Sequence, residues 1–122
     1  MFKKILIILF ISLLPSATLA NNASDLFNNE EYDAAYRAAY AEALSGDSES
    51  SFVIGQILIE GKGSSKKARN KGINFIKKAA ENDYLKAVIF LAKAYEEGKH
   101  TSKSNSRSLK YYEQCEKLGG SS

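Results

Sequence analysis

The sequence predicts an all-α protein built as a short array of antiparallel helix pairs. Apolar residues recur at helical spacing through most of the chain after residue 24. Two short apolar runs, 57–59 and 88–91, have the composition of strands, but both lie inside longer helical patterns. The central stretch 71–98 predicts a helix, a tight turn and a second helix closed by glycine, and its parts recur on both sides at a spacing of about 36 residues. Such a repeat indicates stacked helical units.

The first 20 residues have the pattern of a secretory signal peptide and are set aside from the fold. Lys3 and Lys4 give a basic start, residues 5–14 are almost wholly apolar, and residues 15–20 carry a proline and then small residues at the cleavage positions. We expect cleavage after Ala20 and a periplasmic or secreted location, with no membrane segment left after cleavage. A membrane anchor is the alternative, but the apolar run is shorter than the ~20 residues that span a bilayer.

Composition narrows the function of the mature chain, which is long enough for one domain with a modest core. The sequence has 17 Lys and Arg against 14 Asp and Glu, and cleavage removes two lysines, so the mature net charge is close to +1. This balance argues against binding to nucleic acid by charge alone. Cys115 is the only cysteine, so no internal disulfide can form. We expect it to pack as a small apolar residue in a helix contact, with a reactive thiol or a bridge between chains as the alternatives.

The opening of the mature chain predicts two helices. Residues 21–29 are polar apart from one apolar pair, and Ser24 with Asp25 can cap a short first helix. Acidic side chains within residues 30–33 suit the first turn of a second helix that runs to Leu44. The expected buried face of that second helix consists of Tyr32, Tyr36, Ala39, Tyr40 and Ala43.

Four more helices follow. Residues 48–60 are apolar around most of the predicted helix, which should therefore have neighbours on both sides. Further helices are predicted at 66–81, 84–97 and 107–118. The connections are a glycine- and lysine-containing loop, a short turn and a polar loop, in that order.

The repeat can be aligned residue by residue. An offset of 37 places Gly61 on Gly98, and an offset of 36 places Phe75 on Tyr111. The one-residue difference falls in the loop after Gly61, which can absorb it. Each unit is therefore a helix, a glycine loop, a second helix and a tight turn.

The aligned positions have physical reasons. Gly61 and Gly98 end a helix where a left-handed residue costs least, and the turn between units carries Gly46, Asp83 or Gly119. We expect Asp83 to set how the two repeats stack. Small residues should let the helix backbones approach closely: Gly55, its equivalent Ala92, and Ala79.

This pattern resembles the Sel-like repeat (SLR) family, which is related to the tetratricopeptide repeats, over residues 24–119. The family's unit has a first helix ending in Tyr-x-x-Gly, then Gly-x-Gly, then Lys-Ala-x-x-Trp-Tyr-x-x-Ala-Ala-x-x-Gly. Residues 95–98 match the first element, 61–63 the second, and both 71–80 and 107–115 the third. Residues 26–35 resemble the half-repeat that begins such proteins.

The chain departs from the family pattern at four positions. Gly72 and Ser108 stand where alanine is usual, Leu58 replaces the tyrosine, and His100 stands where the second glycine belongs. The recurring pattern as a whole carries the resemblance.

The resemblance implies a short right-handed α-solenoid of antiparallel helix pairs whose inner surface binds a protein or peptide, without catalytic residues. We expect a non-enzymatic interaction module, as a monomer or weak dimer. An immunity-type inhibitor of a periplasm-directed toxin is the alternative, since small exported SLR proteins can play that part, and an enzyme of unknown class is the distant one. The expected organisation is a signal peptide (1–20), an opening half-repeat (21–47), two repeats (48–83 and 84–119) and a disordered tail (120–122).

Two surfaces are candidates for partner contact. The first helix of each unit offers polar or aromatic residues, some of which, Tyr95 especially, we expect to be used in packing: Ser51, Gln56, Glu60, Lys93, Tyr95 and Glu96. Equivalent loops of a solenoid stack along one edge. We therefore expect a basic edge, with solvated loop lysines as the alternative: Lys62, Lys66, Lys67, Lys99 and Lys103.

The sequence offers little for catalysis, cofactors or metals. His100 is the single histidine, lies in a polar loop, and is expected to be solvated. No set of ligands at metal-binding spacing surrounds it. Residues 61–67 superficially resemble a phosphate-binding loop, but they follow a helix and lack the Gly-Lys-Ser/Thr ending.

The sequence allows two ways of packing the C-terminal end of the array. The chain stops after Tyr111, Tyr112 and Leu118 with no further helix to cover them. Either the last helix is amphipathic enough to close the stack, or its outer face receives a partner or a second copy.

Overall fold

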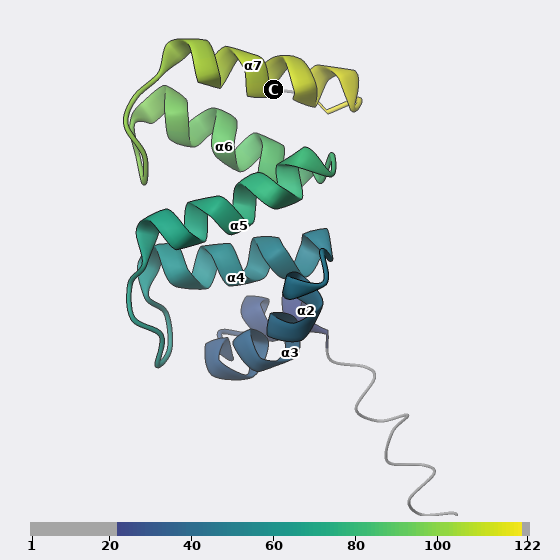
Figure 1. The fold of residues 1–122 in the computed structure, drawn as a ribbon, viewed down its shortest axis with the longest axis vertical. Helices are drawn as coiled ribbons and strands as arrows, with labels where there is room; N and C mark the ends of the chain where they lie inside the picture. The colour runs from purple at the N-terminus through teal and green to yellow at the C-terminus, as the bar shows by residue number, and fades with distance from the viewer. Residues whose placement is uncertain (1–21, 121–122) are drawn as a thin grey trace, which may run out of the picture.

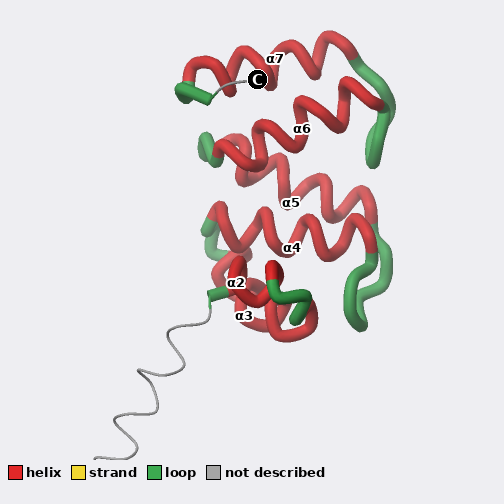
Figure 2. Tube along the Cα trace, turned by 180° about the vertical axis from the view of Figure 1, so that it is seen from behind, coloured by secondary structure: helices red, strands yellow, loops and turns green. Residues whose placement is uncertain are grey.

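The computed structural model describes residues 22–120, which form six helices and, within that range, no strand (Figures 1 and 2). The helices are α2 (Ala23–Asn28), α3 (Tyr32–Leu44), α4 (Ser48–Glu60), α5 (Arg69–Glu81), α6 (Leu85–Glu97) and α7 (Asn105–Lys117). They run back and forth in one stack, with α2 and α3 at one end and α7 at the other. The predicted all-α class is confirmed. The predicted signal peptide lies outside the described residues.

The helix pairs follow the chain. The main contacts are α4 with α5, α6 with α7, and α3 with α4, while α5 with α6 joins the two repeats. Along the described part of the chain, no helix is both long and apolar enough to cross a membrane.

Two helix starts differ from the sequence prediction. α5 begins at Arg69, later than residue 66, because the Ala68 amide donates to the Leu58 carbonyl at 2.7 Å and so ties the end of the loop to α4. α7 begins at Asn105, earlier than residue 107, because the Ser104 hydroxyl caps the Arg107 amide at 3.3 Å.

Each described helix ends in a residue of left-handed conformation. After that residue, the next amide donates back to the carbonyl five residues earlier, at 2.8–3.1 Å, which is the Schellman arrangement. The predicted left-handed positions are confirmed for Gly46, Gly61, Asp83, Gly98 and Gly119, with φ between 60° and 102°. The sequence prediction missed one end. Glu30, which we placed in the first turn of α3, has φ 63° and ends α2.

The core consists of two clusters that meet on α4. On one side, Val53, Ile54 and Ile57 pack against the alanine face of α3. On the other side, Phe52 and Ile59 join α5, α6 and α7. The prediction that α4 has neighbours on both sides is therefore confirmed. The predicted buried face of α3 is partly wrong, because Tyr40 is 40% exposed while Ala35, Ala39 and Ala43 carry the contact.

The two helix pairs cross at equivalent positions but with different chemistry. In the first repeat, a Cβ built on Gly72 would lie 2.7 Å from the Gly55 carbonyl oxygen, so the two backbones touch. In the second repeat, Ala92 and Ser108 occupy these places, and the Ser108 hydroxyl donates to the Ala92 carbonyl at 2.9 Å in the core. The departures from the family pattern at Gly72 and Ser108 are thus packing solutions.

The loop difference predicted from the two offsets is visible in paired hydrogen bonds. At the start of each loop, Lys62 donates to Ile57 and Lys99 donates to Ala94, an offset of 37. At the end, Ala68 donates to Leu58 and Ser104 donates to Tyr95, so the donor offset has fallen to 36. The extra residue of the first loop therefore lies between these two anchors.

The crossing predicts the effect of a single methyl group. Gly72→Ala should lower the free energy of unfolding by about 1–3 kcal/mol, because its Cβ would overlap the Gly55 carbonyl oxygen and lie 3.0 Å from the Ile59 nitrogen. Helix propensity alone predicts a gain of about 1 kcal/mol, so the two effects have opposite signs.

Urea unfolding of the variant measures the sign. Ser108→Ala is the matched control, because that position already accommodates a Cβ and loses only a hydrogen bond, worth about 0.5–1.5 kcal/mol. A Gly72→Ala variant more stable than the parent would contradict the close backbone contact.

Candidate functional site

A depression lies on the surface formed by the first helices of the repeats, α4 and α6, together with α2. We call this depression the first-helix groove. It consists of two adjoining hollows of about 60 and 210 Å³ that share Phe27 and Gln56. Its walls come from α2, α4, α6 and the loop after α6, and its residues are Ser24, Phe27, Asn28, Phe52, Val53, Gln56, Ile59, Glu60, Tyr84, Lys86, Phe90 and His100.

An aromatic row crosses the groove between α4 and α6. Tyr84 lies 5.7 Å from Phe52, Phe52 lies 6.0 Å from Phe90, and Phe90 lies 5.9 Å from His100, measured between ring centres. Phe52 is buried and the other three rings are half-buried. Rings that are only partly covered can still bury apolar side chains of a partner.

The rim of the groove is polar. Gln56 lies half-buried in both hollows, and an amide can both donate and accept hydrogen bonds. Glu60 is exposed and pairs with Lys62 at 3.2 Å, while Lys86 is exposed on the far side. The groove therefore combines an aromatic floor with hydrogen-bonding groups at its edge.

The structure divides the predicted contact residues. Gln56 and Glu60 line the first-helix groove. Ser51 and Tyr95 are each only 2% exposed, so packing claims both. The Ser51 hydroxyl donates to the Ala43 carbonyl at 3.5 Å, because α3 covers this side of α4.

The other two predicted contact residues lie outside the groove. Lys93 is exposed on α6, at the position equivalent to Gln56 in the first repeat. Glu96 accepts a hydrogen bond from the Tyr112 hydroxyl and shares a separate hollow with Leu109 and Glu113 at the α7 end of the stack. Leu109 is 59% exposed, so the outer face of α7 retains an apolar side chain in water.

The two lysine-bearing loops lie on the same edge of the stack, at one end of the helix pairs (Figures 1 and 2). Lys66, Lys67, Lys99 and Lys103 are exposed there. Lys62 is different, because it lies 5.0 Å from the centre of the Tyr32 ring and pairs with Glu60. The hydrogen bond to Glu60, and then the Tyr32 phenol, raise the pKa of Lys62 above its ordinary value.

A contact that the sequence analysis missed fixes the first of these loops. The Ser64 amide and hydroxyl both donate to the Asp33 carboxylate at 2.7 Å. These two bonds lower the pKa of Asp33, the backbone bond contributing most. The sequence alone predicts Asp33 only as an acidic residue suited to the first turn of α3, because its partner lies 31 residues away and leaves no local signal.

The expectation of a solvated His100 is wrong. His100 is half-buried, stacks on Phe90 with an interplanar angle of 12°, and lines the first-helix groove. Its φ of 68° matches the 63° of Gly63, so the histidine keeps the left-handed conformation of the family's second glycine.

Cys115 is 1% exposed in the core between α6 and α7, as expected for a packing residue. Within residues 22–120, no three His, Cys, Asp or Glu side chains gather in a way that could hold a metal ion.

Comparison with solved structures decides the fold. The chain is similar to the crystal structure of a protective antigen present in uropathogenic Escherichia coli strains and displaying an SLR fold, with a TM-score of 0.63 and 19% sequence identity. The match covers 69% of this chain and 18% of that chain. The chain has the SLR fold. No family model matches the sequence, and no curated protein does.

The SLR fold explains which site features the sequence analysis found and which it missed. Equivalent positions such as Gln56 and Lys93 are visible in the repeat alignment. The aromatic row is not visible in that alignment, because Phe52 and Phe90 do not occupy equivalent positions: Phe52 aligns with Ile89. The row depends on the gap between α4 and α6, which only the packing defines.

The groove predicts a pH dependence of stability. Burial lowers the pKa of His100, and the charges of Lys99, Arg69 and Lys67 act in the same direction against the opposing effect of Glu60. The unfolded chain, with a histidine pKa of about 6.5, therefore takes up the proton before the folded chain does. The free energy of unfolding should fall as the pH decreases below about 6.5.

His100→Asn tests this, because asparagine tolerates the left-handed conformation and does not titrate. His100 is the only histidine in the chain, so the variant should lose most of the dependence between pH 5.5 and 7.5. Urea unfolding across this range measures both proteins. Parallel stability profiles would show that His100 is as easily protonated in the folded state as in the unfolded chain.

Proposed function

We propose that this protein is a non-enzymatic interaction module of the periplasm or secreted space that holds a protein or peptide segment in the first-helix groove. The observation that carries the proposal is the aromatic row, Tyr84–Phe52–Phe90–His100, which crosses a hollow with a polar rim. Interfaces are enriched in aromatic residues at their centre and polar groups at their rim.

The dimensions of the groove suit a segment of chain. The hollows extend from Ser24 and Tyr84 at one end to Glu60 and His100 at the other, across three helices. A partner segment could place apolar side chains on Phe90 and Phe27 and a backbone amide or carbonyl against Gln56. The exposed lysines of the loop edge add positive charge beside the groove, which would speed the approach of an acidic partner.

The binding proposal is tested by capture from the cell-envelope fraction with the mature chain as bait. Gln56→Arg puts a longer charged side chain into both hollows and should weaken retention of the captured partner at least tenfold. Asn74→Arg adds the same charge to the exposed surface of α5, outside both hollows, and should leave retention unchanged. Isothermal titration with the captured partner gives the affinities.

Two results would count against the groove. Equal retention of the partner by the two variants would show that the contact lies outside the groove. If no protein is retained at any salt concentration, the proposal that this chain is an interaction module is wrong.

Export is tested separately. The predicted cleavage after Ala20 implies that the protein recovered from the periplasm or medium starts at Asn21. Intact-mass spectrometry of the recovered chain measures the start. A chain that keeps residues 1–20 in the membrane fraction would indicate an anchor.

A further inference from the structure

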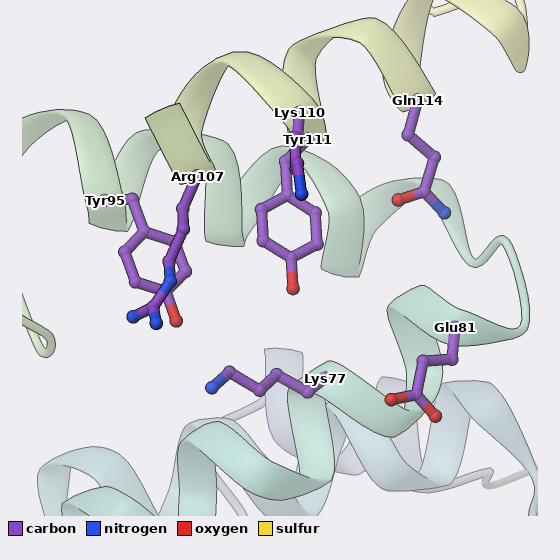
Figure 3. A pocket seen from close by; sticks show the side chains of 7 residues that line it. All are labelled: Lys77, Glu81, Tyr95, Arg107, Lys110, Tyr111 and Gln114. Carbon is purple, nitrogen blue, oxygen red and sulfur yellow. The ribbon is translucent and has the colours of Figure 1, made fainter. Parts of the chain in front are cut away.

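A second groove lies between α5 and α7, over the end of α6, with a volume of about 440 Å³ (Figure 3). We call it the α5–α7 groove. It is independent of the first-helix groove, with which it shares no residue. α7 contributes Arg107, Lys110, Tyr111 and Gln114, and α5 contributes Lys77 and Glu81. Tyr95 from α6 closes the floor.

Two cations converge on the buried Tyr95. The Lys77 ammonium lies 6.0 Å and the Arg107 guanidinium 5.6 Å from the centre of its ring, and Figure 3 shows both pointing toward it. In the part of the chain that the structure describes, the one ion pair within 4.0 Å joins Lys62 and Glu60. Among the described residues, neither cation has a carboxylate within 4.0 Å, so a bound anion between them would reduce any repulsion between the two charges.

The charged side chains are unevenly distributed along the groove. Burial acts to raise the pKa of Tyr95, but the nearby Lys77 ammonium, helped by Thr101 and Arg107, outweighs it and lowers that pKa. Tyr111 stacks on Tyr95 at 5.9 Å, and burial raises its pKa, with Tyr95 and Glu81 acting in the same direction. Lys77 and Arg107 therefore give the Tyr95 end of the groove positive charge, while Glu81 adds a negative charge near Tyr111.

Only part of this cation set belongs to the repeat pattern, in which Arg107 takes the place of the motif lysine. At the equivalent positions of the first repeat, Leu58 stands for Tyr95, Asn74 for Lys110 and Phe75 for Tyr111. Of the α7 cations, only Arg107 has a basic counterpart, Lys71. Packing of a helix pair is therefore satisfied without the charged groove.

The shape of the groove favours an elongated anion. Arg107, Lys110 and Gln114 lie on one stripe of α7 that extends over about 10 Å. Side chains two residues apart in an extended peptide lie on one side and are separated by about 6.5–7 Å. The Gln114 amide donates to the Ala80 carbonyl at 2.8 Å and to Asp83 at 2.9 Å, which fixes the far end.

We propose that the α5–α7 groove binds an extended acidic segment of a protein partner through two carboxylates at alternate positions. One carboxylate lies between Lys77 and Arg107 above Tyr95, and the second reaches Lys110. Arginine offers a carboxylate two parallel hydrogen bonds, which fixes the first position. Glu81 limits the number of acidic residues that the groove accepts.

The test is an amide NMR titration of the protein with the peptide acetyl-Gly-Glu-Ala-Glu-Gly-amide. We expect saturable shifts confined to α5 and α7 around the groove. The glutamine version of the peptide should bind at least tenfold more weakly. The double variant Lys77→Gln/Arg107→Gln should also weaken binding at least tenfold.

The matched control is Lys78→Gln/Lys117→Gln, which removes the same charge from exposed positions of the same two helices and should change the affinity less than twofold. Glu81→Gln should tighten binding about two- to fivefold by removing a repelling charge. This gain keeps the test decisive if the double variant fails to fold.

Three results would overturn the proposal. Equal weakening of binding by the two double variants would show that the peptide is attracted only by the net charge of the protein. Equal affinity for the glutamine peptide would show that the carboxylates are not recognised. Inorganic phosphate that shifts the same residues with the same affinity would make this a site for a compact anion. Gln56→Arg should leave the peptide affinity unchanged, so failure of either groove is distinguishable from failure of the other.

Discussion

The structure depends on the way its helices end. At six places among the described residues, the chain takes one left-handed residue and the following amide bonds back to a carbonyl five residues earlier. This geometry stops a helix and turns the chain back, within three residues after α2, α3 and α5 and through longer loops after α4 and α6, so that successive helices lie beside each other. Four of the six positions carry glycine, for which the conformation costs least. At Asp83, the carboxylate accepts the Gln114 amide, so the reversal between repeats is also tied to α7.

Close packing of the helix pairs then determines where the surface is open. Gly55 and Gly72 bring α4 and α5 into backbone contact, and Ser108 bonds the Ala92 carbonyl at the equivalent crossing of α6 and α7. Contact between successive pairs is looser, and aromatic rings fill the space between α4 and α6. The first-helix groove lies above these rings. Its floor therefore consists of the same side chains that close the gap between the repeats.

Much of this fold could be predicted from the sequence because it is encoded locally. Helical periodicity, glycine helix ends and the 36- to 37-residue offsets gave six helices, five of the six left-handed ends and the place of the extra loop residue. The side-chain sites were less predictable, because they join residues that no repeat relates. Ser64 donates to Asp33 across 31 residues, His100 stacks on Phe90, and Lys77 and Arg107 each lie near the Tyr95 ring. Burial of Ser51 and Tyr95 likewise depends on which helix covers them.

Tyr95 shows why the two grooves are separate surfaces. As a residue of a first helix, it is a candidate for partner contact beside Gln56, and the candidate for which packing is the strongest alternative. The α6–α7 crossing instead buries its ring beneath α7, so that it meets the cations of the second helices. Leu58, its counterpart, enters the other core cluster and has no hydroxyl to present. The differences between the repeats at these positions therefore give the second repeat a charged face that the first repeat lacks, while the first-helix groove stays aromatic. A partner that engaged both grooves would need an apolar segment for one and an acidic segment for the other.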